Sequence, residues 1–475
     1  MTSGRDECGV FAVYAPGEDV AKLCFYGLYA LQHRGQESAG IAVSDGRHIL
    51  VTKEMGLVSR VFSESRLAGM DGDLGIGHVR YSTTGGSTWE NAQPAFRATA
   101  AGSGFALAHN GNLVNTGDLA RILGPAGDSC ATDSALFAEV LAQEVGAAQL
   151  GDTLAAVCAQ APGAYSMVVM DERAIYAVRD PHGVRPLVLG RLDRGGQGGW
   201  VVASETVALD IVGATYVRDV RPGELLTIDG QGLRSRQFAE PDPHFCVFEY
   251  VYVARPDHRV DDRGTVYSIR HRMGELLAAE APVDADLVIP VPDSGTAAAA
   301  GYAEASGIPY AEGLTKNRYV GRTFIQPTQS LRQLGIRLKL NPLRDVIGGK
   351  RLLVVDDSIV RGNTSRQLVA MLLQAGATEI HLRITSPPVR HPCFYGIDMA
   401  THDELIASRL DVEGVRAFLG ADSLAYLSLD GLVQATGRPG GQLCRACFDG
   451  CYPIPVPAEQ QAGGKDVLVA LRAGS

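Results

Sequence analysis

The sequence pattern changes near residue 240, and this change divides the chain into two regions that must fold differently. In the N-terminal region, short apolar segments separated by glycine, such as residues 104–108 and 165–170, predict β-strands. Two helical patterns, at residues 20–32 and 132–145, interrupt them. Few helices among many strands favour an α+β domain built on antiparallel sheets.

The C-terminal region alternates strand and helix patterns. Residues 287–291 and 352–355 predict short buried strands, each followed by a polar loop and a helical pattern, and residues 380–384 predict the next strand. This alternation predicts a parallel sheet covered by helices, and therefore an α/β domain. The predicted organisation is a domain at residues 8–236, a second domain at 245–451 and a loosely ordered tail at 452–475.

The composition excludes several classes of protein. With 46% hydrophobic and 20% charged residues, the chain can form sizeable cores. A net charge of −10 without a basic block argues against nucleic-acid binding. No apolar run approaches the ~18 residues of a membrane span, and the N-terminus lacks the features of a secretory signal. We therefore expect a cytoplasmic protein, whose nine cysteines are buried, metal-binding or catalytic rather than disulfide-bonded.

Cys8 is a candidate nucleophile. A thiol needs a local base or a lowered pKa before it can attack a carbonyl. If residues 1–7 were removed, the freed α-amine of Cys8 would lie beside its own thiol, and its usual pKa of ~7.7–8.0 suits proton transfer near neutral pH. Taken alone, Cys8 has the more ordinary interpretation of a buried structural cysteine.

Other motifs of the N-terminal region supply what attack on an amide requires. Asn110 and Gly111, which follow a predicted strand, could form an oxyanion hole. Arg80 offers a guanidinium fork for a carboxylate, and Asp133 could pair with an ammonium group. Singly, Arg80 and Asp133 are of types that usually lie at the surface. In combination, these residues predict an enzyme that attacks the side-chain amide of a free amino acid.

Five segments occur in order over residues 8–236, namely CGVFAVY, LQHRGQESAGIA, GHVRYSTTG, HNGNL and TDSALF. Together they resemble the glutaminase domain of the N-terminal-nucleophile amidotransferases. The resemblance implies a four-layer αββα fold, with a cysteine nucleophile as the first residue of the mature chain. Because seven residues precede Cys8, it also implies that residues 1–7 are a propeptide. The residues it assigns are Cys8 as nucleophile, Asn110 and Gly111 as oxyanion hole, and Arg80 and Asp133 as glutamine ligands.

Asp356 and Asp357 end an apolar predicted strand in RLLVVDDSIVRGNTS, and the polar loop 358–364 after them opens a helix. Backbone N–H groups at a helix N-terminus bind phosphate. Carboxylates at the end of a parallel strand can reach sugar hydroxyls or a Mg²⁺-bound pyrophosphate, and this edge is where open α/β sheets bind ligands. The sequence contains no Walker A loop.

This run resembles the phosphoribosyl-pyrophosphate (PRPP) motif of the type I phosphoribosyltransferases. The resemblance implies that Asp356 and Asp357 bind the ribose and one Mg²⁺ per subunit, and that Ser294 of the pyrophosphate loop PDSG contributes to the metal site. It also implies that residues 316–327 form a loop that closes over PRPP and excludes water. The residues it assigns to PRPP binding are Asp293, Ser294, Gly295, Lys316, Arg322, Lys339, Asp356, Asp357, Ser358, Arg361, Gly362, Asn363 and Thr364.

Cys444 and Cys447 form a CxxC pair, which alone leaves redox, zinc and iron–sulfur chemistry open. Cys246 in HFCVFEYVYVARPD and Cys393 in HPCFYGIDM lie in segments that resemble the cluster-containing amidophosphoribosyltransferases. The resemblance implies one structural [4Fe–4S] cluster per subunit on these four thiolates. Cys451 is assigned no role, and the cysteines expected to be buried are Cys24, Cys130 and Cys158.

Over nearly the whole chain, the two regions together resemble the amidophosphoribosyltransferase family. The resemblance implies that the chain hydrolyses glutamine and uses the ammonia to displace pyrophosphate from PRPP. The products would be 5-phosphoribosylamine, glutamate and pyrophosphate, in the first committed step of purine synthesis. It further implies a homotetramer that is inhibited by the purine nucleotides AMP, GMP, ADP and GDP.

Three alternatives explain less of the sequence. A hexosamine-phosphate synthase would share the N-terminal motifs but not the PRPP motif. A PRPP-binding regulator would need neither Cys8 nor HNGNL. An iron–sulfur redox protein would account for the CxxC pair but leave both substrate sites unexplained.

Overall fold

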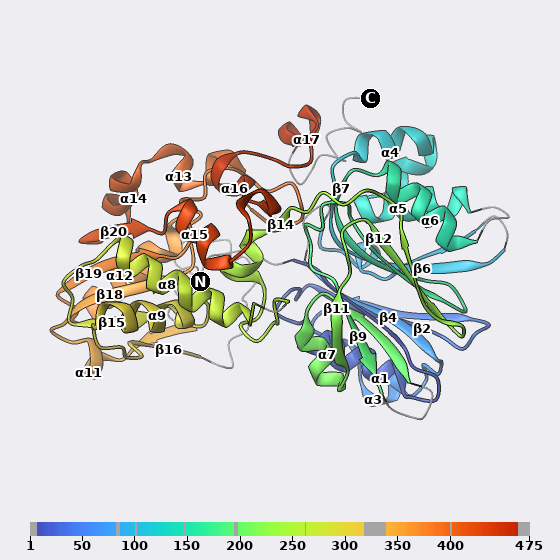
Figure 1. Ribbon diagram of the computed structural model, residues 1–475, viewed down its shortest axis with the longest axis horizontal. Helices are drawn as coiled ribbons and strands as arrows, with labels where there is room; N and C mark the ends of the chain where they lie inside the picture. The colour runs from blue at the N-terminus through green and yellow to red at the C-terminus, as the bar shows by residue number, and fades with distance from the viewer. Residues whose placement is uncertain are drawn as a thin grey trace.

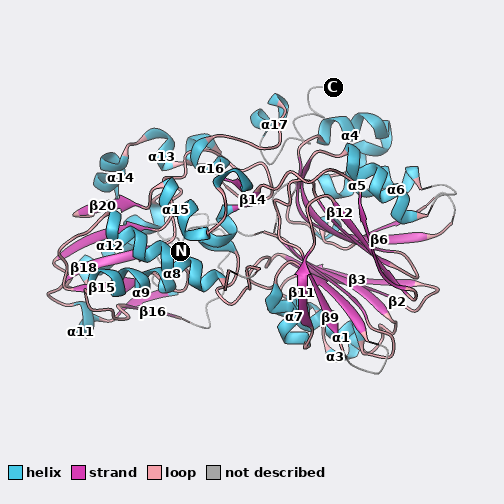
Figure 2. Cartoon of the chain, viewed as in Figure 1, coloured by secondary structure: helices cyan, strands magenta, loops and turns pink. Residues whose placement is uncertain are grey.

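The computed structural model describes residues 7–81, 86–99, 102–145, 149–193, 198–261, 263–317, 339–399 and 401–463. The N-terminal region, coloured blue to green in Figure 1, lies beside the C-terminal region, coloured yellow to red. Helices flank the strands in both regions (Figure 2). Among the described residues, no helix combines the length and apolar character that crossing a bilayer requires.

The N-terminal region contains two antiparallel sheets. The order of the seven-stranded sheet is β11 (Thr215–Asp219), β9 (Val188–Leu192), β10 (Gly199–Ala203), β1 (Gly9–Tyr14), β4 (Leu74–Arg80), β2 (Ser38–Ser44) and β3 (Ile49–Met55). The order of the six-stranded sheet is β13 (Gly232–Gln237), β12 (Glu224–Asp229), β8 (Ile175–Arg179), β7 (Gly163–Met170), β6 (Gly104–Leu113) and β5 (Ala95–Ala98).

Helices cover the outer face of each sheet. The seven-stranded sheet carries α1 (Val20–Ala30), α2 (Val58–Val61), α3 (Glu64–Leu67) and α7 (Thr206–Val212). The six-stranded sheet carries α4 (Thr116–Leu123), α5 (Asp133–Glu144) and α6 (Leu150–Gln160). The short turns η1 (Trp89–Asn91) and η2 (Gly124–Ser129) complete this region.

The alternation of side chains along the strands explains these layers. In β1, Phe11 and Val13 pack against the helices, whereas Val10 and Ala12 face the core between the two sheets. Successive side chains of a strand point to opposite faces, so a strand that is apolar at every position is buried on both sides. The resulting four layers, helix, sheet, sheet and helix, confirm the αββα prediction.

The C-terminal region is built on a four-stranded parallel sheet. Its order is β15 (Leu287–Pro290), β18 (Arg351–Asp356), β19 (Glu379–Ile384) and β20 (Ser423–Tyr426). One face is covered by α8 (Val266–Glu280), α9 (Thr296–Ser306) and α15 (Leu429–Thr436). The other face is covered by α11 (Arg344–Ile347), α12 (Asn363–Gln374), α13 (Ile406–Arg409) and α14 (Val412–Leu419). The predicted α/β class is confirmed.

Several elements were not predicted. The two-residue strands β14 (Phe245–Cys246) and β21 (Leu443–Cys444) pair in parallel, which brings the end of the chain back to the segment between the regions. The predicted loose tail contains α17 (Ala458–Gly463), and the rest of it, from residue 464, lies outside the described residues. The remaining elements are η3 (Glu249–Val253), β16 (Leu314–Lys316), β17 (Leu340–Pro342), η4 (His402–Glu404), η5 (Gly440–Gln442) and α16 (Ala446–Asp449).

Candidate active sites

The first candidate site is a cleft at the start of β1. Cys8 lies next to this strand and is 7% exposed. Its Sγ donates a hydrogen bond to the backbone oxygen of Tyr81 at 3.5 Å. The cleft brings together residues from five separate segments of the chain. The residues that line it are Cys8, Arg80, Tyr81, Gln93, His109, Gly111, Thr132, Asp133 and Ser134.

Asn110 and Gly111 lie within β6 rather than after a strand, so that part of the prediction is wrong. The strand continues through both residues because β7 pairs with them, Asn110 opposite Ser166 and Gly111 opposite Tyr165. Gly111 has φ +147°, and a Cβ there would lie 2.0 Å from the backbone oxygen of Ala164. Only glycine therefore fits at this position of the cleft.

Arg80 and Asp133 are buried, at 3% and 4% exposed, although their residue types suggest the surface. Asp133 is the first residue of α5, and its Oδ2 accepts a hydrogen bond from the backbone N–H of Leu113 at 3.1 Å. Arg80 ends β4 and donates to the backbone oxygen of Gly86 at 3.2 Å. One cationic and one anionic side chain thus lie beside the thiol, as binding of an amino acid requires.

The thiol of Cys8 is neutral near pH 7. Burial raises its pKa to about 11, although the hydrogen bond to Tyr81 and the charge of Arg80 lower it. The α-nitrogen of Cys8 is still part of the peptide bond with Glu7, so it cannot act as a base.

Three polar residues that line the cleft, Gln93, His109 and Ser134, were not identified from the sequence. His109 Nδ1 lies 2.9 Å from Ser134 Oγ, and the backbone N–H of His109 donates to Gln93 Oε1 at 2.7 Å. Burial lowers the pKa of His109, so the imidazole is neutral. His109 and Ser134 belong to the motifs HNGNL and TDSALF, which was the available signal. Their contact joins β6 and α5 at the wall of the cleft.

The second candidate site lies at the carboxyl ends of β15 and β18. Ser294 Oγ donates to Asp357 Oδ2 at 2.6 Å, which brings the predicted pyrophosphate loop to the paired carboxylates. Asp356 and Asp357 are buried, and the hydroxyl of Ser358 donates to Asp357. A Cβ on Gly295 would lie 2.4 Å from the backbone oxygen of Val355, which is too close. The pyrophosphate loop can therefore approach the end of β18 only because residue 295 is glycine.

The loop after Asp357 turns into α12 as predicted. Gly362 adopts φ +75° just before the helix, and Asn363 and Thr364 form its first turn. The N–H groups of this turn have no partner within the helix and are available to an anion. Arg361 forms an ion pair with Glu404 at 3.0 Å.

Lys316 begins the predicted closing loop, and Lys339 follows that loop in the sequence. Lys316 ends β16 and forms an ion pair with Asp293 of the pyrophosphate loop. The backbone N–H of Asn317 donates to the oxygen of Lys339 at 2.9 Å, so both lysines lie at one end of this hairpin. Arg322 falls at residues 318–338, which lie outside the described residues.

The four predicted cluster cysteines come together between the regions. Cys246 pairs with Cys444 across β14 and β21. The backbone N–H groups of Arg390 and His391 donate to the oxygen of Cys447, which brings the loop that carries Cys393 to the same place. Burial raises the pKa of the Cys447 thiol, and its cysteine neighbours raise it further.

These four sulfurs are not arranged for a single Zn²⁺ ion. With Zn–S bonds of about 2.3 Å, a tetrahedral site holds its sulfurs about 3.8 Å apart. Among the described residues, all four cysteines included, no three cysteine sulfurs lie within 4.8 Å of one another. Of the other cysteines, Cys24, Cys130 and Cys158 are buried as predicted, and Cys451 is exposed.

The loop that follows Cys393 touches the first site. The side-chain amide of Asn112 donates to the backbone oxygen of Phe394 at 2.9 Å. Gly396 has φ +105°, and a Cβ there would lie 3.0 Å from the backbone carbons of Gly111. A segment of the C-terminal region therefore packs directly against the predicted oxyanion hole. Sequence reasoning did not identify this contact.

Comparisons with known proteins agree with this geometry. The glutamine amidotransferase domain family matches residues 78–210. The amidophosphoribosyltransferase of Mycobacterium tuberculosis is 59% identical over 98% of this chain and 90% of its own length. The corresponding protein of Bacillus subtilis is 48% identical, and the match covers 95% of this chain and 95% of the relative.

Two solved structures share the whole architecture. One, described as the allosteric regulatory enzyme of purine biosynthesis, is 46% identical with a TM-score of 0.88, and covers 95% of this chain and 97% of its own. The other is the glutamine PRPP amidotransferase of Bacillus subtilis complexed with ADP and GMP, 45% identical with a TM-score of 0.87, covering 95% and 98%. The chain therefore belongs to the amidophosphoribosyltransferase family, as its motifs predicted.

Proposed function

We propose that the chain makes 5-phosphoribosylamine by dividing the family's reaction between its two sites. Glutamine is hydrolysed at the Cys8 cleft, and the ammonia displaces pyrophosphate from C1 of PRPP at the carboxyl ends of β15 and β18. The observation that carries this proposal is the convergence of Cys8, Arg80, Gly111 and Asp133 in one cleft. The products are 5-phosphoribosylamine, glutamate and pyrophosphate, which places the reaction at the start of purine synthesis.

In the first site, Arg80 binds the α-carboxylate of glutamine and Asp133 its α-ammonium group. The α-amine of Cys8 takes the thiol proton, and Sγ attacks the side-chain carbonyl carbon. The amide of Asn110 and the N–H of Gly111 stabilise the oxyanion. Ammonia leaves with the transferred proton, and water hydrolyses the thioester to glutamate and the free thiol.

This mechanism requires removal of residues 1–7. While the Glu7–Cys8 peptide bond is intact, the thiol has a pKa of about 11 and no α-amine beside it. Hydrolysis of that bond consumes one water and produces a carboxyl group on Glu7 and an amine on Cys8. The intact mass of the active protein tests this: the chain should begin at Cys8, and an active chain beginning at Met1 or Thr2 would contradict it.

In the second site, Asp356, Asp357 and Ser294 would hold one Mg²⁺, because oxygen ligands at the end of a strand suit this hard cation. When bound, Mg²⁺ neutralises the pyrophosphate leaving group. The first turn of α12 binds the 5′-phosphate through backbone N–H groups. Lys316, Lys339 and Arg322 supply positive charge around the pyrophosphate.

We assign one [4Fe–4S] cluster per subunit to Cys246, Cys393, Cys444 and Cys447. Two features support this fit, namely the convergence of the four cysteines on one place and the buried guanidinium of Arg185 beside them. Arg185 Nη2 has no hydrogen-bond partner among the described residues. Burial lowers the pKa of Arg185, whereas the neighbouring Cys246 and Cys393 raise it. A cluster here would be structural, since the reaction transfers no electrons.

Analysis of iron and sulfide tests the cluster. A Cys393→Ser variant should lose most of its iron, and the matched Cys451→Ser variant should keep it, because Cys451 is exposed and lies outside the set. Stoichiometric zinc without iron in the unaltered protein would contradict the assignment.

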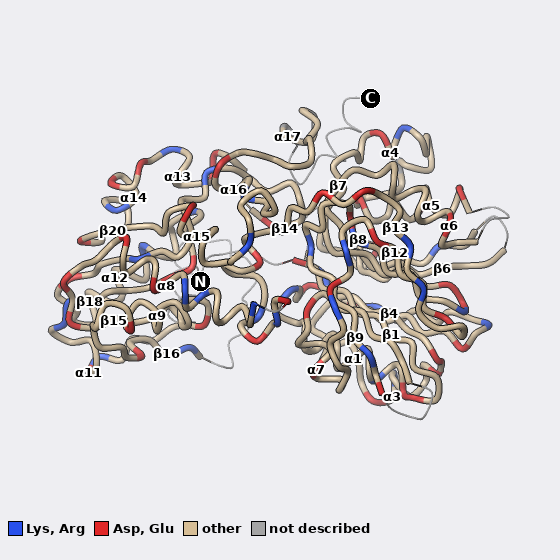
Figure 3. The backbone as a smooth tube through the Cα atoms, viewed as in Figure 1, with Lys and Arg blue, Asp and Glu red and all other residues tan. Residues whose placement is uncertain are grey.

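We further propose a cytoplasmic homotetramer that AMP, GMP, ADP and GDP inhibit. The similar solved structure from Bacillus subtilis is a complex with ADP and GMP, which supports nucleotide binding. Reduced thiols of this kind persist where disulfides are rare. Lys and Arg alternate with Asp and Glu over both regions (Figure 3), and such a mixture does not favour nucleic acid as a partner.

The direct test of the proposed function is the balance of products. Supplied with glutamine, PRPP and Mg²⁺, the protein should release glutamate and pyrophosphate in equal amounts. Glutamate formation that never yields pyrophosphate would contradict it.

A further inference from the structure

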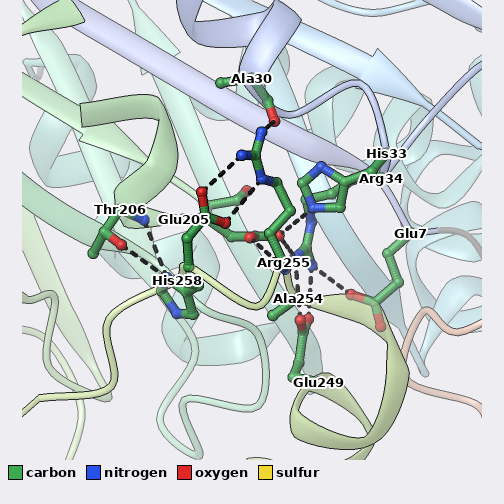
Figure 4. A network of polar contacts seen from close by, with 12 residues as sticks. Glu7, Ala30, His33, Arg34, Glu205, Thr206, Glu249, Ala254, Arg255 and His258 are labelled. Carbon is green, nitrogen blue, oxygen red and sulfur yellow. Dashed lines mark hydrogen bonds and ion pairs between the residues drawn. The ribbon is translucent and has the colours of Figure 1, made fainter. Parts of the chain in front are cut away.

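A buried network of charged side chains surrounds the residue that precedes Cys8 (Figure 4). Its central members come from both regions and are each at most 1% exposed, namely Glu7, Arg34, Arg185, Glu205 and Glu249. Glu249 accepts two hydrogen bonds from Arg34, at 2.7 and 3.1 Å, and Glu205 accepts one at 2.5 Å. The carboxylates raise the pKa of Arg34 by more than burial lowers it, so this guanidinium is charged. Glu7 completes the network.

Arg34 contacts the residues on both sides of the Glu7–Cys8 peptide bond. Its Nη2 donates to Glu7 Oε2 at 2.7 Å, and its Nε donates to the backbone oxygen of Cys8 at 3.1 Å. A guanidinium is planar and its N–H groups have a fixed geometry. One rigid group therefore determines where the peptide bond lies relative to the thiol of Cys8.

A second guanidinium holds the other oxygen of Glu7. Arg185 Nη1 donates to Glu7 Oε1, and Arg185 Nε donates to the backbone oxygen of Tyr395 at 2.8 Å. Arg34 and Arg185 are both buried and donate to different oxygens of Glu7. The carboxylate of Glu7 therefore lies between two guanidinium groups. Each guanidinium makes one charge-assisted hydrogen bond to Glu7, a kind of bond that is stronger than a neutral one.

The charges of the network favour departure of Glu7 once the bond is broken. The intact chain buries three carboxylates, of Glu7, Glu205 and Glu249, against the guanidinium groups of Arg34 and Arg185, and His33 Nε2 lies 2.7 Å from Glu205. Hydrolysis adds a carboxylate to Glu7 and an amine to Cys8 that is largely protonated near neutral pH, so these two new charges offset each other. After Glu7 leaves, two carboxylates face two guanidinium groups, so the buried charges balance.

We propose that Glu7 is a positioning residue whose carboxylate, held by Arg34 and Arg185, places the Glu7–Cys8 peptide bond for its own hydrolysis. The Arg34–Arg185 pair is then a carboxylate site that selects glutamate at the position before the nucleophile. This inference rests on the proposed removal of residues 1–7. The bond between Glu7 and Cys8 breaks, water is consumed, and the carboxyl and amine groups form on Glu7 and Cys8.

The test follows the appearance of chains that begin at Cys8, by intact mass against time, in the full-length protein. Glu7→Gln keeps the shape of the side chain and removes its charge, so cleavage should slow about tenfold or more, the effect of losing a charge-assisted hydrogen bond. Glu7→Asp keeps the charge and should be cut faster than Glu7→Gln. Asp6→Asn is the matched control, with the same loss of charge one residue earlier, and should be cut at the unaltered rate.

A chain in which residues 1–7 are deleted, so that removal of the initiator Met exposes Cys8, separates positioning from folding. It should hydrolyse glutamine as fast as the processed protein, because Glu7 acts only before cleavage. Cleavage of Glu7→Gln at the unaltered rate, or equal slowing in Asp6→Asn, would overturn the inference. An unaltered chain that never begins at Cys8 would instead overturn the proposed removal of residues 1–7.

Discussion

At the scale of single residues, the two sites use charged side chains that are buried. Arg80, Asp133, Asp356 and Asp357 are all less than a tenth exposed. Composition alone places such residue types at the surface, and only their motifs indicated otherwise. The motifs made these assignments possible because each motif holds its functional residues within a few positions of one another. Arg34 and Arg185 could not be assigned, since their partner Glu249 is far away in the sequence and the pairing exists only in the fold.

Asp133 gives a prediction about glutamine binding. Asp133→Asn keeps an oxygen that accepts the backbone N–H of Leu113, but it removes the charge that would pair with the substrate ammonium. The KM for glutamine should rise about tenfold or more, as for loss of a hydrogen bond to a charged group. Ammonia-dependent synthesis and the thermal unfolding temperature should stay unchanged. An unaltered KM would show that Asp133 does not bind glutamine.

The thiol of Cys8 gives a prediction about pH. In the chain that retains residues 1–7, burial raises its pKa to about 11, and only the thiolate reacts with an alkylating agent. Alkylation of the Cys8 peptide by iodoacetamide should therefore rise about tenfold per pH unit from pH 7 to pH 10. In the chain that begins at Cys8, alkylation should level off at a lower pH. A midpoint near pH 8 in the uncut chain would contradict this.

At the scale of elements, the sequence predicted those whose pattern repeats. β7, β15, β18 and β19 lie where apolar segments placed them, and α9 follows β15 as the helical pattern there predicted. β14, β21 and η3 were missed because two-residue strands and single turns have no periodicity. They form through tertiary contacts between residues distant in sequence. β6 extends to Leu113, beyond the predicted strand at residues 104–108. Pairing with β7 compensates for the poor strand propensity of asparagine and glycine.

The loop beyond Cys393 gives a prediction at this scale. Gly396→Ala adds a Cβ about where Gly111 lies, so it should displace the oxyanion hole and lower glutamine-dependent kcat, while ammonia-dependent kcat stays near normal. Gly307→Ala is the matched control. Gly307 also has a positive φ, +74°, but nothing lies within 4 Å of the added Cβ. Equal losses in the two variants would mean that backbone strain, not contact with Gly111, causes the effect.

At the scale of the whole molecule, the C-terminal region supports the first site as well as forming the second. Arg185 donates to the backbone oxygen of Tyr395, and Gln460 of α17 donates to that of Leu113 at 3.1 Å. These contacts link the cysteine-rich segments to the cleft around Cys8. The sequence predicted the fold of each region, because each has its own pattern of strands and helices. It could not predict how the regions meet, because that contact depends on loops without regular structure.

The central claim is that glutamine hydrolysis and attack on PRPP occur at separate sites. The most direct measurement compares synthesis of 5-phosphoribosylamine from glutamine and from ammonia in Cys8→Ala, with Cys24→Ala as a control for loss of a buried thiol. We expect Cys8→Ala to lose glutamine-dependent synthesis, by at least about a thousandfold for a missing nucleophile, and to keep ammonia-dependent synthesis. Cys24→Ala should keep both. Loss of both activities in a folded Cys8→Ala protein would contradict the account.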